Sequence, residues 1–161
     1  MRKTVLTIYL ALILIPALAF GYQFEDYVWG TPKAKIKKQL GLKNEAVTEE
    51  VIEGCDVLQY SDRIFDKECR VQFGFTPKAK LLFQISIGWD GDVCDNMRKR
   101  MVDKYGEPQE DFLGTYIWGD PFEKQEDSMM LRYHKANSRT GLYYYSGKYF
   151  KQYEQEYKPF Q

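Results

Sequence analysis

Three cysteines, Cys55, Cys69 and Cys94, carry the most definite chemistry in this chain. An odd number in an oxidising compartment is most simply one disulfide and one free thiol. We predict a Cys55–Cys69 disulfide because these residues flank a segment, 57–65, that is typical of a β-hairpin. In the chain-entropy model, closing this loop would raise the free energy of unfolding by about 3 kcal/mol. Cys94 is expected to pack as a small apolar residue on a helix, with a disulfide or a reactive thiol as alternatives.

The sequence contains few residues that could bind a metal ion or act as a catalytic acid or base. His134 is the only histidine, so a multi-histidine zinc site is excluded, and we expect a strand-face residue rather than a catalytic base. The oxygen-rich segment 90–96 does not follow the twelve-position calcium loop, and Asp92 is expected to cap a helix. The usual serine-nucleophile, phosphate-loop and dinucleotide motifs are absent. We predict no metal and no cofactor, and an enzyme, such as a hydrolase with paired carboxylates, is the less favoured alternative.

The carboxyl-terminal segment holds most of the candidate binding residues. Tyrosines recur there at four-residue steps, which places them in one stripe on a helix. Such a stripe usually packs on its own sheet, but a flat ring that carries a hydroxyl also suits protein interfaces and sugar stacking. Two tryptophans have the same two interpretations. The candidate binding residues are Tyr145, Tyr149, Tyr153, Tyr157, Trp29 and Trp118.

The elements that must position these residues follow an amino-terminal leader, residues 1–21. Two basic residues precede an apolar run, 5–15, which Pro16 breaks before a group of small residues. This pattern predicts a secretory signal peptide that is cleaved after Ala19 or Gly21. An uncleaved anchor is the alternative, but the run is shorter than the ~20 residues of a spanning helix. We expect a periplasmic or secreted protein with no stable membrane anchor after cleavage.

Composition limits the remaining chain to one compact domain over 22–161. The 23 basic residues balance the 23 acidic ones, which argues against nucleic acid as a partner. Aromatic residues make up 16% of the chain, enough to build a core and to leave rings at the surface. Disorder is therefore not expected.

Hydrophobic periodicity predicts an α+β fold, an antiparallel sheet with helices packed mainly on one face. The expected order is helix, strands, helix, strands and a terminal helix. The first helix should begin at Thr31 and Pro32 and end at Gly41, and the second should run from Asp92 to Gly106. Segment 43–54 is expected to be a connection with at most a short element. The predicted strands are 69–75, 81–87, 115–118, 129–134 and 142–146.

Several loose motifs span most of this domain. They include the Trp-Gly-Thr-Pro helix start at 29–32, the strand phenylalanines Phe73 and Phe75, the helix end at 104–108, and Trp118. Together they resemble small exported bacterial proteins of uncharacterised families. In outline the chain is also similar to the helix-plus-strand units of the β-lactamase-inhibitor-protein and outer-membrane-assembly-lipoprotein folds. That resemblance implies an architecture and no functional residue.

We expect a non-enzymatic binding or accessory role in the periplasm, through contacts with another exported or envelope protein. A small-ligand or glycan-binding protein is the alternative. The classes make different demands: an interaction protein should expose an aromatic patch, a ligand carrier should enclose an apolar pocket of some hundreds of cubic ångströms, and an enzyme should gather acids or His134 in a cleft.

Overall fold

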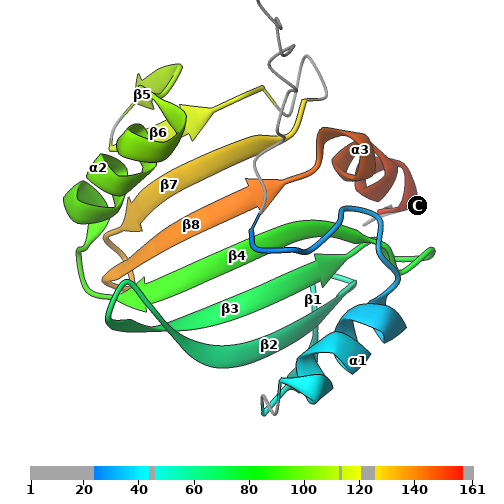
Figure 1. The fold of residues 1–161 in the computed structure, drawn as a ribbon. Helices are drawn as coiled ribbons and strands as arrows, with labels where there is room; N and C mark the ends of the chain where they lie inside the picture. Colours follow the sequence, from blue (N-terminus) through cyan, green and yellow to red (C-terminus); the bar gives the residue numbers. More distant parts are fainter. Residues whose placement is uncertain (1–23, 44–45, 113, 121–125, 158–161) are drawn as a thin grey trace, which may run out of the picture.

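A computed structural model describes residues 24–43, 46–112, 114–120 and 126–157. The predicted signal peptide and both of its cleavage sites lie outside these residues. The described chain forms an α+β unit with the predicted order of elements (Figure 1). Among its helices, none is long and apolar enough to cross a bilayer. The elements are α1 Lys33–Leu42, β1 Thr48–Ile52, β2 Cys55–Ile64, β3 Lys67–Phe75, β4 Leu82–Asp90, α2 Cys94–Tyr105, β5 Glu110–Phe112, β6 Thr115–Trp118, β7 Ser128–His134, β8 Arg139–Tyr145 and α3 Gly147–Glu156.

All the described strands join one antiparallel sheet in the order β1-β2-β3-β4-β8-β7-β6-β5. The chain therefore contains the same arrangement twice, a helix followed by a four-strand meander, and the two meanders meet where β4 pairs with β8. This junction lies at the centre of the sheet (Figure 1). Residues far apart in the sequence are thereby brought next to each other on β4 and β8.

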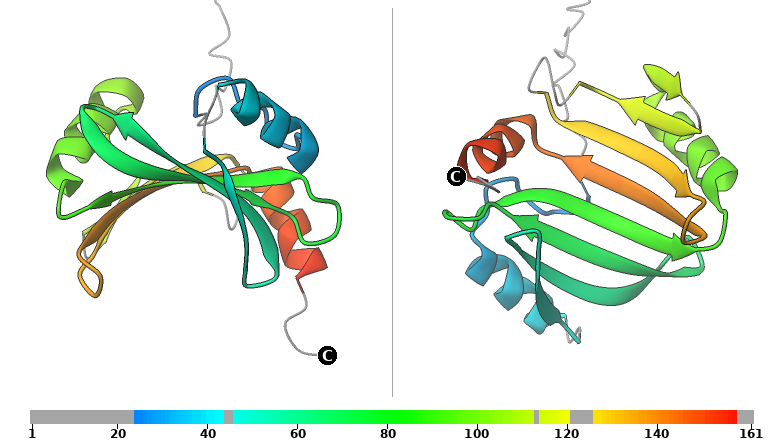
Figure 2. Two further views of the ribbon diagram at one scale, coloured as in Figure 1. Left: turned by 90° about the horizontal axis from the view of Figure 1, so that it is seen from below. Right: turned by 180° about the vertical axis from the view of Figure 1, so that it is seen from behind.

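The core lies between one face of the sheet and the helices α1 and α2. Alternate residues of the central strands point to this face, so each of these strands has one apolar side, as the alternating pattern predicted for β3 and β4. Figure 2 shows α1 and α2 on this side of the sheet and α3 on the other. The helices contribute Ile36, Leu40, Met97 and Met101 to a cluster with the buried strand residues Leu58, Phe73, Ile85, Leu131, Leu142 and Tyr144.

Ion pairs attach α1 to the first two strands. The Lys33 ammonium lies 2.8 Å from a carboxylate oxygen of both Glu49 and Asp56. These hydrogen bonds hold the pKa of Asp56 below its ordinary value and raise the pKa of Lys33. The helix begins at Lys33, one residue later than predicted, because Thr31 donates its hydroxyl to the Val28 carbonyl instead of capping the helix.

The predicted Cys55–Cys69 disulfide is wrong, and all three cysteines are free and buried. The hairpin turn lies at Phe65 and Asp66, both with positive φ, so β2 extends further than the sequence suggested. Cys69 is consequently paired with Asp62, seven residues along β2 from Cys55. That separation is about 23 Å, and its odd number turns the two thiols to opposite faces of the sheet. A disulfide requires Cα atoms less than about 7 Å apart.

Candidate ligand groove

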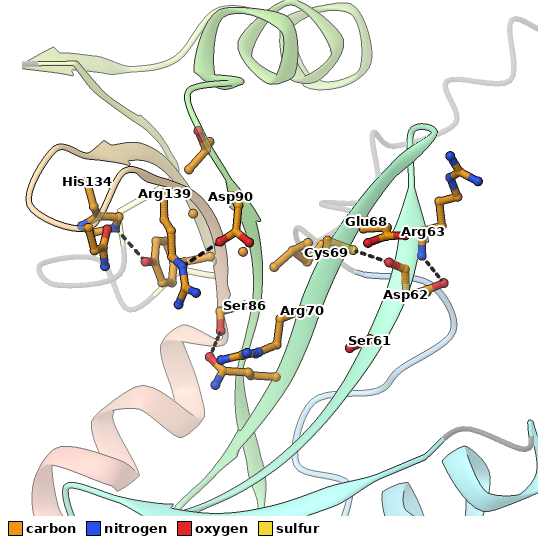
Figure 3. Close-up of a pocket in the computed structure, with 17 residues that line it drawn as sticks. Ser61, Asp62, Arg63, Glu68, Cys69, Arg70, Ser86, Asp90, His134 and Arg139 are labelled. Atoms are coloured by element: carbon orange, nitrogen blue, oxygen red, sulfur yellow. Dashed lines mark hydrogen bonds and ion pairs between the residues drawn. The ribbon is translucent and has the colours of Figure 1, made fainter.

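Helix α3 covers only one end of the sheet face that is opposite the core. Its Phe150 and Tyr153 rings pack on Phe83, with centroids 6.3 and 4.8 Å away. The rest of this face carries a hollow of about 680 Å³, here called the groove, which lies between the tips of the β2–β3 and β7–β8 hairpins (Figure 3). Six residues from three strands characterise it: Arg70 of β3, Ser86, Gly88 and Asp90 of β4, and Arg139 and Tyr143 of β8.

Two glycines from the central strands meet on the floor of the groove. Gly88 of β4 pairs directly with Gly141 of β8. A Cβ at Gly141 would lie 2.5 Å from the Tyr143 hydroxyl, so the tyrosine ring occupies the space above this glycine. A Cβ at Gly88 would meet nothing within 4 Å, and its φ is not positive. Neither packing nor backbone conformation therefore requires a glycine at position 88.

Tyr143 is held in place by the histidine of the neighbouring strand. The Tyr143 hydroxyl and the His134 Nε2 atom are 2.8 Å apart. Burial lowers the pKa of His134, and the nearby positive charge of Arg132 lowers it further, so the imidazole is neutral at pH 7. Burial also raises the pKa of Tyr143. The pair is thus uncharged and forms a fixed polar wall.

A hydrogen-bonded row of side chains continues the wall across three strands. Gln72 donates to Gln59 at 3.0 Å, and Ser86 donates to the Gln72 side-chain oxygen at 3.2 Å. These three residues occupy one register row with Tyr143, because Gln59 pairs with Gln72, Gln72 with Ser86, and Ser86 with Tyr143. The groove therefore offers hydroxyls and amides in fixed positions.

Charges of both signs lie around the floor. The Arg139 guanidinium donates to Asp90 at 2.9 Å. Arg70 of β3 pairs with Gly88 of β4. Its side chain makes no ion pair or hydrogen bond with the residues that the structure describes. Figure 3 shows Arg70 and Arg139 extending over the groove on the two sides of Ser86. Arg70 is thus a guanidinium available to a ligand.

The groove does gather His134 with carboxylates, the arrangement expected of an enzyme, but their setting does not favour hydrolysis. The Asp90 side chain is 88% exposed and already paired with Arg139. Glu68 is exposed and faces Arg63 across the β2–β3 hairpin. The carboxyl of a general acid is usually buried or beside a second carboxylate, whereas Asp90 and Glu68 are both exposed and lie beside arginines.

The tyrosine stripe predicted from the sequence lies on α3 and its approach, and it is largely used for packing. Tyr153 stacks on Phe83 and on Tyr157, with centroids 4.8 and 5.3 Å apart. Tyr145 contacts the edge of Phe150 at 5.6 Å, and burial strongly raises the pKa of its hydroxyl. Tyr149 lies against Gly30, where a Cβ would overlap its ring. Ligand or partner binding by these four tyrosines stays a prediction.

The two predicted tryptophans lie on the core side. Trp118 is 1% exposed and donates its indole N–H to the Gly106 carbonyl at 2.8 Å, which fastens the end of α2 to β6. Trp29 is half-buried against the core. Neither lines the groove.

The oxygen-rich segment 90–96 does not converge on one point. Asp90 is bound to Arg139. The N-cap of α2 is Val93 and not the predicted Asp92, because the helix begins at Cys94, whose amide donates a hydrogen bond to the Asp92 side chain at 3.1 Å. Within the described part of the chain, no group of three or more histidine, cysteine, aspartate or glutamate side chains is placed to hold a metal ion.

Burial also keeps the thiols unreactive. It raises the pKa of Cys55 and Cys69, and it raises the pKa of Cys94 to about 11, so the nucleophilic thiolate is disfavoured at neutral pH. Cys94 begins the predicted amphipathic helix and packs in the core.

Comparison of the chain with protein-family models, with curated proteins and with solved structures finds no match. The residues of the groove, rather than a relative, therefore supply the basis for a functional proposal.

Proposed function

We propose that this chain is an exported, non-enzymatic binding protein that holds a small polar ligand in the groove. The observation that carries the proposal is the groove itself, a hollow of about 680 Å³ with fixed polar groups around a bare backbone floor. Its volume is in the range of small-molecule sites, roughly 300–1,000 Å³. Its polar lining suits a hydroxylated ligand such as a glycan better than an apolar one. The signal peptide predicted from residues 1–21 is the basis for proposing export.

A screen against a panel of immobilised glycans and soluble metabolites tests this proposal, with wild type compared to Gly88→Val. We expect a ligand that the wild type retains and the variant loses, because valine would fill the floor without disturbing the fold. Equal retention by both proteins would place binding elsewhere. Turnover of a bound ligand would contradict the non-enzymatic part of the proposal.

A protein partner at the edge of the sheet is the second candidate, favoured by the exposure of β1. No described strand pairs with its outer edge, and all five of its residues are exposed. Val51 is 71% exposed and Ile52 is 42% exposed. An extended segment of another exported protein would add to this edge as a further strand. Val51→Lys should abolish such a complex while leaving binding at the groove unchanged.

A further inference from the structure

We infer that the groove selects a saccharide that carries a carboxylate, with a sugar ring lying against Gly88 and the acid group held by Arg70. This inference rests on the proposed function and names the class of ligand. It is drawn from three features of the groove: the vacant floor, the unpaired guanidinium and the balance of charges.

The vacant floor indicates where the ligand touches the protein. A glycine inside a central strand weakens the sheet and often marks a close approach of a ligand or another backbone. Gly141 has a partner in the fold, since the Tyr143 ring covers it, but Gly88 has open space above it. A flat ring placed on Gly88 would contact its backbone on one side. It would lie between Arg70, which pairs with Gly88 from β3, and the Tyr143 ring, which covers the β8 partner Gly141.

The free guanidinium indicates an acid group on the ligand. A guanidinium presents a planar pair of donors that matches a carboxylate, and such charge-assisted pairs are stronger than neutral hydrogen bonds. Asp90 already accepts from Arg139, whereas Arg70 is not paired with any described carboxylate. Arg70 of β3 would reach a ligand carboxylate that lies beside Ser86. The other neighbours of that carboxylate would be the uncharged Ser86 and Gln72 side chains.

The balance of charges argues against a densely charged ligand. Three arginines and three carboxylates line the groove, so its acidic side chains would repel a polyphosphate or a highly sulfated chain. The carboxylates of the groove are also good hydrogen-bond acceptors for sugar hydroxyls. A ligand with many hydroxyls and one acid group per ring would therefore use both the arginines and the carboxylates. These six residues are Arg63, Arg70, Arg139, Asp62, Glu68 and Asp90.

Calorimetric titration of the mature protein with digalacturonate, and with its methyl ester as the uncharged match, tests the inference. We expect the acid to bind at least 10-fold more tightly than the ester at low salt, and to lose affinity as salt is raised because Arg70 is exposed. Arg70→Gln should remove most of this preference. Lys67→Gln, the same loss of charge on β3 outside the groove, should leave it unchanged.

The outcomes separate the two proposals. Equal binding of acid and ester at the groove would overturn the acidic-ligand inference and leave the proposed function standing. Binding of neither would overturn the inference too, while the glycan and metabolite screen with Gly88→Val judges the proposed function independently. Preference for the acid that survives in Arg70→Gln would refute the assignment of Arg70. An unchanged urea midpoint in both variants shows that the fold is intact.

Discussion

The sheet face opposite the core has two ends, and they use the same strands in opposite ways. At one end β4 and β8 carry large rings, Phe83 and Tyr145, which α3 covers with Phe150 and Tyr153. At the other end the same two strands carry Gly88 and Gly141, and none of the described helices covers them. We therefore expect the aromatic end to stabilise the fold and the glycine end to leave space for a ligand.

Replacing Tyr153 by alanine should break the aromatic end and give the largest effect on stability. The change removes the stack on Phe83 and leaves a gap under α3. Because Tyr153 is only half-buried, we expect a loss of about 2–3 kcal/mol in the free energy of unfolding, below that of a fully buried ring. Urea denaturation measures it. A loss below about 0.5 kcal/mol would mean that α3 contributes little to the fold.

Gly141→Val should have the next largest effect, because its side chain would collide with the Tyr143 ring. We expect a loss of about 1–3 kcal/mol, the usual cost of overpacking. The displaced tyrosine should also give up its hydrogen bond to His134. Denaturation by urea, with the tyrosine ring followed by NMR, checks both effects, and a stable variant with Tyr143 unmoved would contradict the packing described here.

Gly88→Val is the same substitution as Gly141→Val, made on the neighbouring strand β4. It should raise the free energy of unfolding instead of lowering it. Its side chain meets nothing within 4 Å and valine favours strands, so we expect a gain of about 0.5–1 kcal/mol. Urea denaturation of Gly88→Val and Gly141→Val measures the free energy of unfolding of both variants. A gain in the first and a loss in the second would distinguish a glycine that leaves space for a ligand from one needed for packing. A destabilised Gly88→Val protein would show that position 88 serves the fold.

His134→Gln should produce the smallest effect, visible in the pH dependence of stability. Because the pKa of His134 is lower in the folded protein than its ordinary 6.5, the unfolded chain binds more protons below that value. Stability is therefore complete above pH 6.5 and falls as the pH decreases. We expect wild type to lose more stability than His134→Gln between pH 7 and pH 5, by a few tenths of a kcal/mol. Identical pH profiles from urea titrations would contradict the histidine's neutral state.

Much of the fold was predictable because its signals are local. The alternation over 69–75 and 81–87 matches β3 and β4, and Gly106 ends α2 as predicted. β1 was not assigned, because all its side chains are exposed and no alternation marks it. The hairpin predicted within 57–65 is wrong, because residues 57–64 belong to the single strand β2 and the turn to β3 lies at Phe65 and Asp66. The sequence contains no sign of that turn, since Phe65 and Asp66, rather than glycine or asparagine, adopt its positive φ values.

The groove was not predictable as a site because its residues are separated in the sequence and meet only through strand pairing. Arg70, Gly88 and Gly141 come from three strands, and the pairing of β4 with β8 spans the whole second meander. The available signal was the pair of glycines within apolar strand patterns, which often marks a close approach by another group. The tyrosines drew attention to the end of this face that α3 covers.

Mapping of backbone amide shifts by NMR during a titration of the protein with digalacturonate would locate the ligand site. We expect the largest shifts on Gly88 and its neighbours across the sheet, Arg70 and Gly141, with little change on α3 or β1. Shifts that are confined to β1 or to the tyrosines of α3 would contradict a ligand site in the groove.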